Sequence, residues 1–256
     1  MEKTNGNQVS LMFSGGVDST TAALRLAEKY DRVHLLTFRN GYGHYRLNRT
    51  RKRVKELKRH AGDRFVHHME SVQPLFEMML ADALEDYRRA GSGFVWCLGC
   101  KMAMHTQSVL YNLRHGIREM TDGSSQSTGE MVEQMLLAVY MVREFYEHYG
   151  IEYRTPVYTI PREEEIENLR KRRFRMGWRI GDRFLGIQPK CRPGELYYLP
   201  FLVLNQPPTH DEEKVSRFLR EKRELAHAYI EKRCLDEGIA PGIAQDTGAT
   251  PGTMEQ

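Results

Sequence analysis

The sequence has little that would place it in or across a membrane. None of its apolar runs approaches the ~20 residues that a membrane-spanning helix requires, and residues 1–7 lack the apolar core of a secretion signal. Cysteine is also scarce, with four in 256 residues, which argues against a disulfide framework and favours metal binding or catalysis. We therefore expect a cytoplasmic protein with no membrane partner.

The composition is that of a soluble globular protein, with 40% hydrophobic and 28% charged residues. The net charge is only +4, but its distribution is uneven. Residues 46–58 hold seven basic side chains against the single acid Glu56, and a second basic run at 170–175 is followed by Trp178 and Arg179. Such runs are usually solvated helix faces, yet two of them, one with interleaved aromatics, are also typical of polyanion binding.

Strand-like and helix-like segments alternate over the first 160 residues. We expect strands at 9–13, 32–38, 64–69, 117–120 and 151–160, and helices at 20–27, 47–60, 74–89, 101–113 and 130–148. This order predicts an α/β fold in which a parallel sheet is covered by helices on both faces. Ligands of such sheets bind at the carboxyl ends of the strands.

Beyond residue 160 the pattern changes to charged helices at 162–175 and 211–234, separated by a proline-dotted stretch at 186–208. We therefore predict three parts. The chain would comprise an α/β domain at 1–160, a mostly helical C-terminal extension at 161–237 that carries Cys191, and a disordered tail at 238–256 rich in Gly, Ala, Thr and Pro.

The most informative motif is Leu-Met-Phe-Ser-Gly-Gly-Val-Asp-Ser-Thr at 11–20, where a buried strand breaks on two glycines and a helix begins. Glycines let the backbone approach a ligand closely, and the amides of a helix N-terminus attract an anion. Hydroxyl groups add donors, and the aspartate is placed to hold a magnesium ion or a substrate group. A plain glycine turn before an ordinary helix cap is the alternative. The candidate residues are Ser14, Gly15, Gly16, Asp18, Ser19 and Thr20.

The Ser-Gly-Gly-x-Asp-Ser string near the start of the chain resembles the signature of the PP-loop ATP pyrophosphatases, which cleave ATP between its α and β phosphates to adenylate a substrate. It is not a Walker P-loop, because no lysine follows at the required place. The resemblance implies that Asp18 lies near magnesium and that adenine lies near Thr37, Phe38 and Arg39, at the tip of the second strand. It also implies that pyrophosphate binds to Ser14, Gly15, Gly16, Ser19 and Thr20.

Three cysteines form a second motif. Cys97 and Cys100 make a Cys-x-x-Cys pair directly before a predicted helix, and Cys191 follows about ninety residues later. Lys190 and Arg192 flank Cys191 and favour its thiolate.

Three interpretations of these cysteines are open. A zinc site would use Cys97, Cys100 and Cys191 and be completed by His105 or Cys234, although Cys234 is more typical of an ordinary helix residue. A redox pair would need Cys97 and Cys100 alone. A [4Fe-4S] cluster would be held by the three cysteines and leave one iron open.

The order of PP-loop, Cys-x-x-Cys and distant cysteine resembles the cluster-dependent tRNA thiolation branch of the PP-loop family, over about residues 8–195. The resemblance implies that Cys97, Cys100 and Cys191 hold a [4Fe-4S] cluster whose open iron carries sulfide. Zinc, or a persulfide on Cys191 or Cys100, is the alternative.

One segment departs from that branch. Asp122-Gly123-Ser124 replaces a Gly-His motif and is closer to the Asp-Gly-Thr of the sacrificial sulfur transferases, which adds Asp122 and Gly123 to the candidate nucleotide site. The acids that usually follow are missing here, so a second magnesium ligand is not evident.

These motifs together predict an ATP-dependent sulfur transferase that adenylates a tRNA base or a small cofactor precursor, with ATP, Mg²⁺, a [4Fe-4S] cluster and a sulfur donor as its partners and a homodimer as a candidate assembly. Asp18, Cys191 and Lys101 are the candidate catalytic residues. Lys101 would stabilise charge and His105 would act as an acid or base. The alternative is that Lys101 is an ordinary surface lysine and His105 a half-buried histidine without a catalytic role. The alternatives are an amide- or nitrile-forming ATP pyrophosphatase with structural zinc, and a non-catalytic nucleotide-binding regulatory module.

Overall fold

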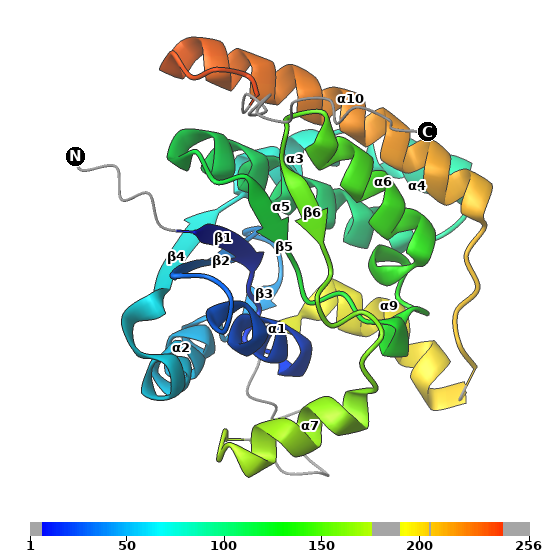
Figure 1. Cartoon of the computed structure of the whole chain (residues 1–256). Helices are drawn as coiled ribbons and strands as arrows, with labels where there is room; N and C mark the ends of the chain where they lie inside the picture. Colours follow the sequence, from blue (N-terminus) through cyan, green and yellow to red (C-terminus); the bar gives the residue numbers. More distant parts are fainter. Residues whose placement is uncertain (1–6, 176–189, 205, 243–256) are drawn as a thin grey trace, which may run out of the picture.

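A parallel sheet lies at the centre of the structure, a computed structural model that describes residues 7–175, 190–204 and 206–242 (Figure 1). Its strand order is β4-β2-β1-β5-β6, and every pairing in it is parallel. The strands are β1 (Gln8–Met12), β2 (Arg32–Arg39), β4 (Phe65–Ser71), β5 (Glu119–Thr121) and β6 (Glu152–Arg154). A two-residue strand, β3 (His44–Tyr45), pairs separately with β7 (Lys190–Cys191).

Helices cover both faces of the sheet, so the predicted fold class is confirmed (Figure 1). One face carries α1 (Val17–Ala27), α2 (Asn48–Ala61) and α7 (Arg162–Lys171). The other carries α3 (Gln73–Met79), α4 (Ala83–Ala90), α5 (Phe94–His115), α6 (Leu136–Glu147) and α10 (Glu212–Glu237). Side chains along β2 alternate between the two faces of the sheet. Val33 and Leu35 pack on the face that carries α1, α2 and α7, while Leu36 and Phe38 pack on the face that carries α5.

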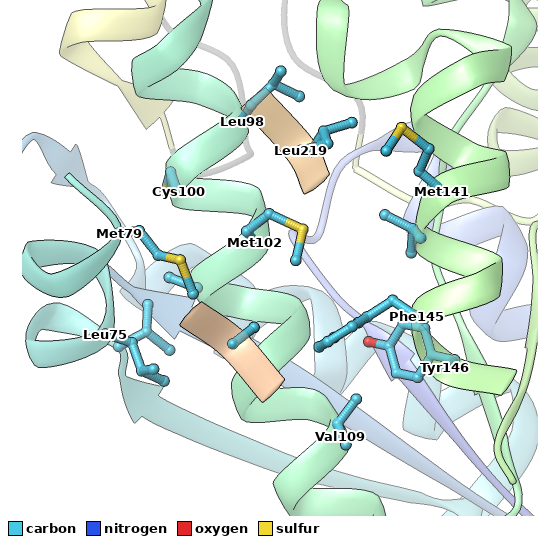
Figure 2. Close-up of a cluster of buried hydrophobic side chains, with 14 of the residues drawn as sticks. Leu75, Met79, Leu98, Cys100, Met102, Val109, Met141, Phe145, Tyr146 and Leu219 are labelled. Carbon is cyan, nitrogen blue, oxygen red and sulfur yellow. The ribbon is translucent and has the colours of Figure 1, made fainter. Parts of the chain in front are cut away.

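The larger core surrounds α5, which is buried on most of its circumference (Figure 2). Met102 and Val109 of α5 share this core with Phe145 of α6 and Leu219 of α10. A helix that is apolar nearly all round belongs in the interior of a domain. The helical region that follows residue 160 therefore packs through α10 onto the α/β part, and the boundaries at 160 and 237 stay predictions.

Several predicted elements differ from the structure. The helix predicted at 74–89 is two helices, because the backbone leaves helical geometry between Leu80 and Asp82. The helix predicted at 101–113 already begins at Phe94, so Cys97 and Cys100 lie inside α5 and not before it. The helix predicted at 130–148 begins at Leu136, after a short 3-10 turn at Val132–Gln134.

The strand predicted at 151–160 ends at Arg154, since Pro156 has no N–H for a sheet ladder and the following residues form turns. The prolines at 186–208 suggested a stretch without regular structure, but α9 (Arg192–Leu204) lies within it and contains Pro200. The helix predicted at 162–175 ends at Lys171, and Arg173 adopts a left-handed conformation (φ 58°).

Gly238, with a φ of +64°, ends α10. Residues 243–256 of the predicted disordered tail lie outside the described residues, as do Trp178 and Arg179 of the second basic run. Within the described ranges, no helix has the length and apolar character to cross a membrane.

Candidate functional site

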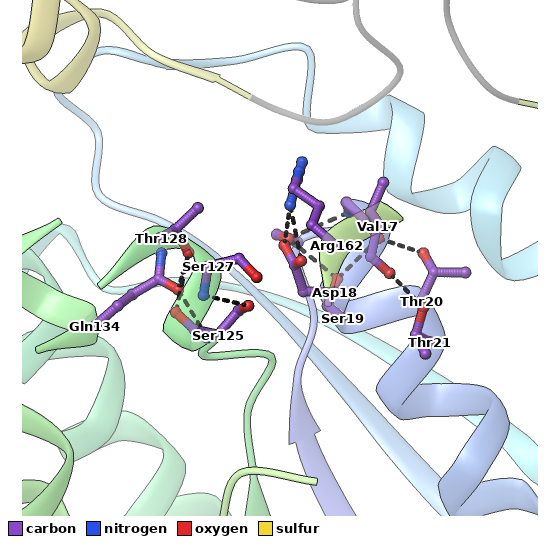
Figure 3. A network of polar contacts seen from close by, with 12 residues as sticks. Val17, Asp18, Ser19, Thr20, Thr21, Ser125, Ser127, Thr128, Gln134 and Arg162 are labelled. Carbon is purple, nitrogen blue, oxygen red and sulfur yellow. Dashed lines mark hydrogen bonds and ion pairs between the residues drawn. The ribbon is translucent and has the colours of Figure 1, made fainter. Parts of the chain in front are cut away.

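The glycine loop stands at the carboxyl end of the central strand β1 (Figure 3). Gly15 has a φ of +74°, and Gly16 is the N-cap residue of α1. The Ser14 and Ser19 hydroxyl groups share a hydrogen bond of 3.1 Å, while Thr20 Oγ1 donates to the Gly16 carbonyl at 2.6 Å. The loop therefore presents the start of α1 and its unpaired amides to whatever binds above the sheet.

A buried arginine fixes the loop against α2. Arg53 is 3% exposed, donates from Nε to the Gly15 carbonyl at 3.4 Å, and pairs with Glu56 at 2.7 Å. Its guanidinium also lies over the Phe174 ring at 5.4 Å. Glu56, the single acid of the basic run at 46–58, thus balances the buried charge of Arg53.

The loop after β5 packs directly on the start of α1. A Cβ atom on Gly123 would lie 2.7 Å from the Ser19 backbone nitrogen, so only glycine fits there. The neighbouring Asp122 is 1% exposed and accepts from Lys101 Nζ at 2.7 Å and from the Ser124 amide at 2.9 Å. Burial alone would raise the pKa of Asp122, but the Lys101 charge and these hydrogen bonds outweigh it and hold the pKa at about 2.

Lys101 and His105 match neither the catalytic pair nor the surface lysine with a half-buried histidine that the sequence suggested. Lys101 is bound to Asp122, and His105 is completely buried, with Nδ1 at 2.9 Å from the Tyr146 hydroxyl. Burial lowers the pKa of His105 to about 3, and the Lys101 charge adds to this. His105 is therefore neutral, and it is neither the half-buried histidine nor a ready acid at neutral pH.

Asp18 is bound by an arginine that sequence reasoning missed (Figure 3). Arg162 Nη1, at the start of α7, lies 2.8 and 3.0 Å from the two oxygens of the Asp18 carboxylate. Glu165, one turn further along α7, is completely buried beside them. The charged run at 162–165 was visible in the sequence, but nothing in it indicated a partner 144 residues away.

A cavity of about 490 Å³ opens at the carboxyl ends of β2 and β4. Thr37 and Phe38, the residues expected near adenine, are part of its lining. Arg39, Arg46 and Arg51 also line the cavity and make it electropositive. Its volume is within the usual range for a small-molecule site, and its charge suits an anionic ligand.

The three cysteines of the second motif converge from two segments. Cys97 and Cys100 lie one turn apart on α5, and Cys191 is directly opposite His44 in the β3–β7 pair. The Sγ atom of Cys100 is 3.9 Å from His44 Nε2 and accepts a hydrogen bond from Asn40 Nδ2 at 3.3 Å. His44 and Asn40 are further residues that sequence reasoning missed, and only their position after a strand end pointed to them.

Burial raises the pKa of all three thiols. Burial raises the pKa of Cys100 to about 12, although the hydrogen bond from Asn40 lowers it, and burial also raises the pKa of Cys97 and of Cys191. The Glu133 carboxylate adds to the effect at all three thiols, the neighbouring thiols add to it at Cys97 and Cys100, and Glu195 adds to it at Cys191. The expectation that flanking cations favour a Cys191 thiolate is wrong. Lys190 pairs with Glu195 at 2.7 Å, and Arg192 lies over the Tyr45 ring at 5.3 Å.

No described group of three or more His, Cys, Asp or Glu side chains is arranged to hold a metal ion. Three cysteines in one place are nevertheless the donor set that zinc and iron–sulfur groups take. The two residues offered as a fourth zinc ligand lie elsewhere. His105 contacts Tyr146, and Cys234 packs near Arg114, about 25 Å along α5 from Cys97 at 1.5 Å per residue.

The first part of the chain also matches a known family model. The model described as "Queuosine biosynthesis protein QueC" matches residues 8–89, about a third of the chain, and includes β1, the glycine loop, α1, β2, α2 and β4. The matched residues include the Ser-Gly-Gly-Val-Asp-Ser loop on the parallel sheet, so the match supports the resemblance to the PP-loop ATP pyrophosphatase superfamily.

Two solved structures are similar to the chain. One is a 4-thiouridine synthetase–RNA complex with bound ATP, at 15% identity and a TM-score of 0.48, with 86% of this chain and 53% of that chain covered. The other is a predicted subunit of tRNA methyltransferase from Methanocaldococcus jannaschii, at 16% identity and a TM-score of 0.40, with 64% of this chain and 76% of that chain covered. The chain thus spans about half the length of the synthetase. A comparison with curated proteins finds no match.

Proposed function

We propose that the chain is a cytoplasmic ATP-dependent sulfur transferase, which adenylates an acceptor and then replaces the adenylated oxygen by sulfur. One observation carries the proposal. His44 lines the electropositive cavity and also lies 3.9 Å from the Cys100 sulfur, so a nucleotide site and a group of three cysteines share one two-residue strand.

The adenylation step would use the loop and the cavity. An acceptor oxygen attacks the α phosphorus of ATP, the bond to the β phosphate breaks, and pyrophosphate leaves. The amides at the start of α1, with Ser14, Gly15, Gly16, Ser19 and Thr20, would receive the departing charge. Thr37 and Phe38 would contact the adenine from the tip of β2, and Asp122 and Gly123 would support the loop from behind.

The sulfur step would occur at the cysteines. Sulfide attacks the adenylated carbon, the carbon–oxygen bond breaks, and AMP leaves with its oxygen. If a persulfide is the donor, its terminal sulfur attacks the carbon and AMP leaves in the same way. The thiolate of a second cysteine then attacks the cysteine sulfur of the remaining sulfur–sulfur bond, which releases the thiolated acceptor and leaves a disulfide between the two cysteines. Cys97, Cys100 and Cys191 would hold a [4Fe-4S] cluster, which supplies bound sulfide when loaded; zinc with a persulfide on Cys191 or Cys100 is the alternative. Burial protects such sulfur from water, and a metal would bind the thiols as thiolates despite their raised pKa.

Lys101 would act through Asp122. Its ammonium group compensates the buried carboxylate, which in turn accepts from both the amide and the hydroxyl of Ser124. This network holds the segment that carries Gly123 against α1. Lys101 is therefore proposed to position the Gly123 segment, in place of the direct catalytic role that the sequence suggested.

The acceptor is proposed to be tRNA or a small cofactor precursor. The exposed face of α2 supports a polyanion, since Arg51 lines the cavity while Lys52 and Lys55 lie exposed on the same helix. A backbone phosphate could be held there while a base enters the cavity.

The decisive experiment is the metal and acid-labile sulfide content of protein purified without oxygen, read with its visible spectrum. We expect iron and sulfide in about a four-to-four ratio and a broad brown absorbance. Asp18→Ala should abolish AMP release, whereas Cys191→Ser should keep AMP release and lose sulfur transfer. Sulfur transfer by Cys191→Ser at the wild-type rate would contradict the three-cysteine site.

A second candidate is an amide- or nitrile-forming ATP pyrophosphatase with structural zinc. The match of residues 8–89 to the queuosine biosynthesis model favours it. Zinc without sulfide in the purified protein would select this candidate. Stabilisation by ATP with no AMP released would instead indicate a nucleotide-binding regulatory module.

A further inference from the structure

Glu165 is a carboxyl group in an unusual environment. The residue is 0% exposed, and neither of its oxygens accepts a hydrogen bond from a cation, hydroxyl or amide among the residues that the structure describes. Burial, the close side-chain contact with Asp18 and the charge of that carboxylate raise the pKa of Glu165 to about 9. An unpaired buried carboxyl costs free energy that an apolar residue at the same place would not.

The packing of α7 on α1 brings Glu165 to this place. Leu169, one turn beyond it, is buried in the same cluster as Ala22 and Leu26 of α1. Positions 162, 165 and 169 are spaced by three and four residues, so they lie on one face of the helix. That face directs Arg162 and Glu165 at Asp18, in the first turn of α1.

The positive charge of Arg162 lies beside the Asp18 and Glu165 carboxyl groups. The Arg162 guanidinium is within 2.8 Å of Asp18 and also lowers the pKa of Glu165 electrostatically, against the larger effect of burial. Magnesium prefers carboxylate, phosphate and water oxygens, and proteins often give it only one or two carboxylates beside substrate phosphates. No described set of three acidic, histidine or cysteine ligands exists, so phosphate and water would supply the other ligands.

We propose that Asp18 and Glu165 together form the divalent-cation site for the ATP phosphates, and that Arg162 neutralises Asp18 when the nucleotide is absent. Glu165 is then the second acidic ligand that the segment after β5 does not offer. When the ion arrives with the nucleotide, Arg162 releases Asp18, and its N–H groups turn to the pyrophosphate oxygens. The inference rests on the proposed use of ATP at this loop.

The test is manganese binding, followed by the electron paramagnetic resonance signal of free Mn²⁺, with and without α,β-methylene-ATP, which cannot be cleaved between its α and β phosphates. With the analogue present, Glu165→Gln should bind Mn²⁺ at least about tenfold more weakly than the wild type, since even the loss of an indirect metal contact costs that much. Glu164→Gln, an exposed position on the same helix, should bind as the wild type does. Arg162→Gln should bind Mn²⁺ more tightly than the wild type when no nucleotide is present.

Circular dichroism checks that each variant folds, and Glu165→Asp, which keeps the charge but shortens its reach, provides a second variant that should also bind Mn²⁺ more weakly. Wild-type affinity for Mn²⁺ in both Glu165 variants, with the analogue bound, would overturn this site alone. A wild-type protein that binds neither the analogue nor Mn²⁺ would overturn the proposed function together with the site.

Discussion

Gly123 lies so close to Ser19 that a methyl group on it would come within 2.7 Å of the Ser19 backbone nitrogen. These residues are more than 100 positions apart, yet their backbones set the distance between β5 and the N-terminus of α1. The glycine loop is therefore shaped from two sides, by Gly123 behind it and by Arg53 of α2 across from it.

Gly123→Ala should displace the two loops and weaken nucleotide binding. The clash is with backbone atoms, which cannot turn away as a side chain does, and overpacking of this kind costs about 1–3 kcal/mol. Urea unfolding and calorimetric titration with α,β-methylene-ATP measure the two effects. Gly242→Ala is the matched control, because its Cβ would meet nothing closer than 3.7 Å. Unchanged nucleotide affinity in Gly123→Ala would show that the contact does not shape the site.

Lys222→Met should destabilise the protein without touching the nucleotide site. Lys222 Nζ of α10 lies 2.7 Å from Asp86 of α4, and both side chains are buried. Removing one partner of a buried ion pair typically costs about 3–5 kcal/mol; here Arg89, also 2.7 Å from Asp86, keeps the loss toward the lower end. The exposed Lys232→Met on the same helix should change the unfolding free energy by less than about 0.5 kcal/mol. Equal urea midpoints for the two variants would contradict this.

Acid should destabilise the fold through His34. Its ring nitrogens contact the Tyr111 hydroxyl at 2.8 Å and Gln8 Oε1 at 2.9 Å, and burial, with the charges of His68 and His115, lowers its pKa to about 4. Between pH 6.5 and 4 the unfolded chain binds a proton that folded His34 does not. The free energy of unfolding should therefore fall as pH falls through this window, by up to about 1.4 kcal/mol per pH unit from this residue.

Above pH 6.5 the His34 ring is neutral in both states, and its contribution no longer varies. Chemical denaturation at several pH values between 7 and 5 should thus give a shallower pH dependence for His34→Gln than for the wild type. Parallel curves for the two proteins would mean that His34 takes up its proton in the folded state as readily as in the unfolded chain.

If tRNA is the acceptor, as proposed, the basic face of α2 should make its binding sensitive to salt. Replacing both Lys52 and Lys55 by Gln should weaken tRNA binding and reduce the slope of log K against log salt concentration by about 0.7–0.9 for each lost phosphate contact. Lys29→Gln with Lys232→Gln, which are exposed on other segments, is a control of equal charge. Fluorescence anisotropy at several salt concentrations measures the slopes, and an equal slope for the two double variants would place the RNA elsewhere.

The sequence predicted the centre of the sheet well and its surroundings less well. The strands expected at 9–13 and 32–38 are observed at Gln8–Met12 and Arg32–Arg39. A strand buried on both faces leaves a continuous apolar run that is local and easily recognised. Pro156 and Pro200 act through hydrogen bonds and packing that depend on the rest of the fold, so neither the early end of β6 nor the presence of α9 could be inferred from them.

The candidate site divides in the same way. Ser14 to Thr20 form one local segment, so the sequence could place these residues together and predict an anion site there, which stays a prediction. Arg162 meets Asp18 only because α7 packs on α1, and Asn40 meets Cys100 only because α5 passes the end of β2. Contacts of this kind have no periodic or motif signature in the chain, which is why sequence reasoning found neither partner.

The two-residue strand β3 has a thermodynamic consequence. One side of it contributes His44 and Tyr45 to the cavity wall, and the same two residues are paired with Cys191 and Lys190. Any ligand in the cavity that shifts β3 must change the affinity of the cysteines for what they bind, and reciprocity requires the cysteines to change the affinity of the cavity by the same factor. Loading of the sulfur site and binding of nucleotide would then be linked equilibria. A change in one would be measured as a shift in the binding curve of the other.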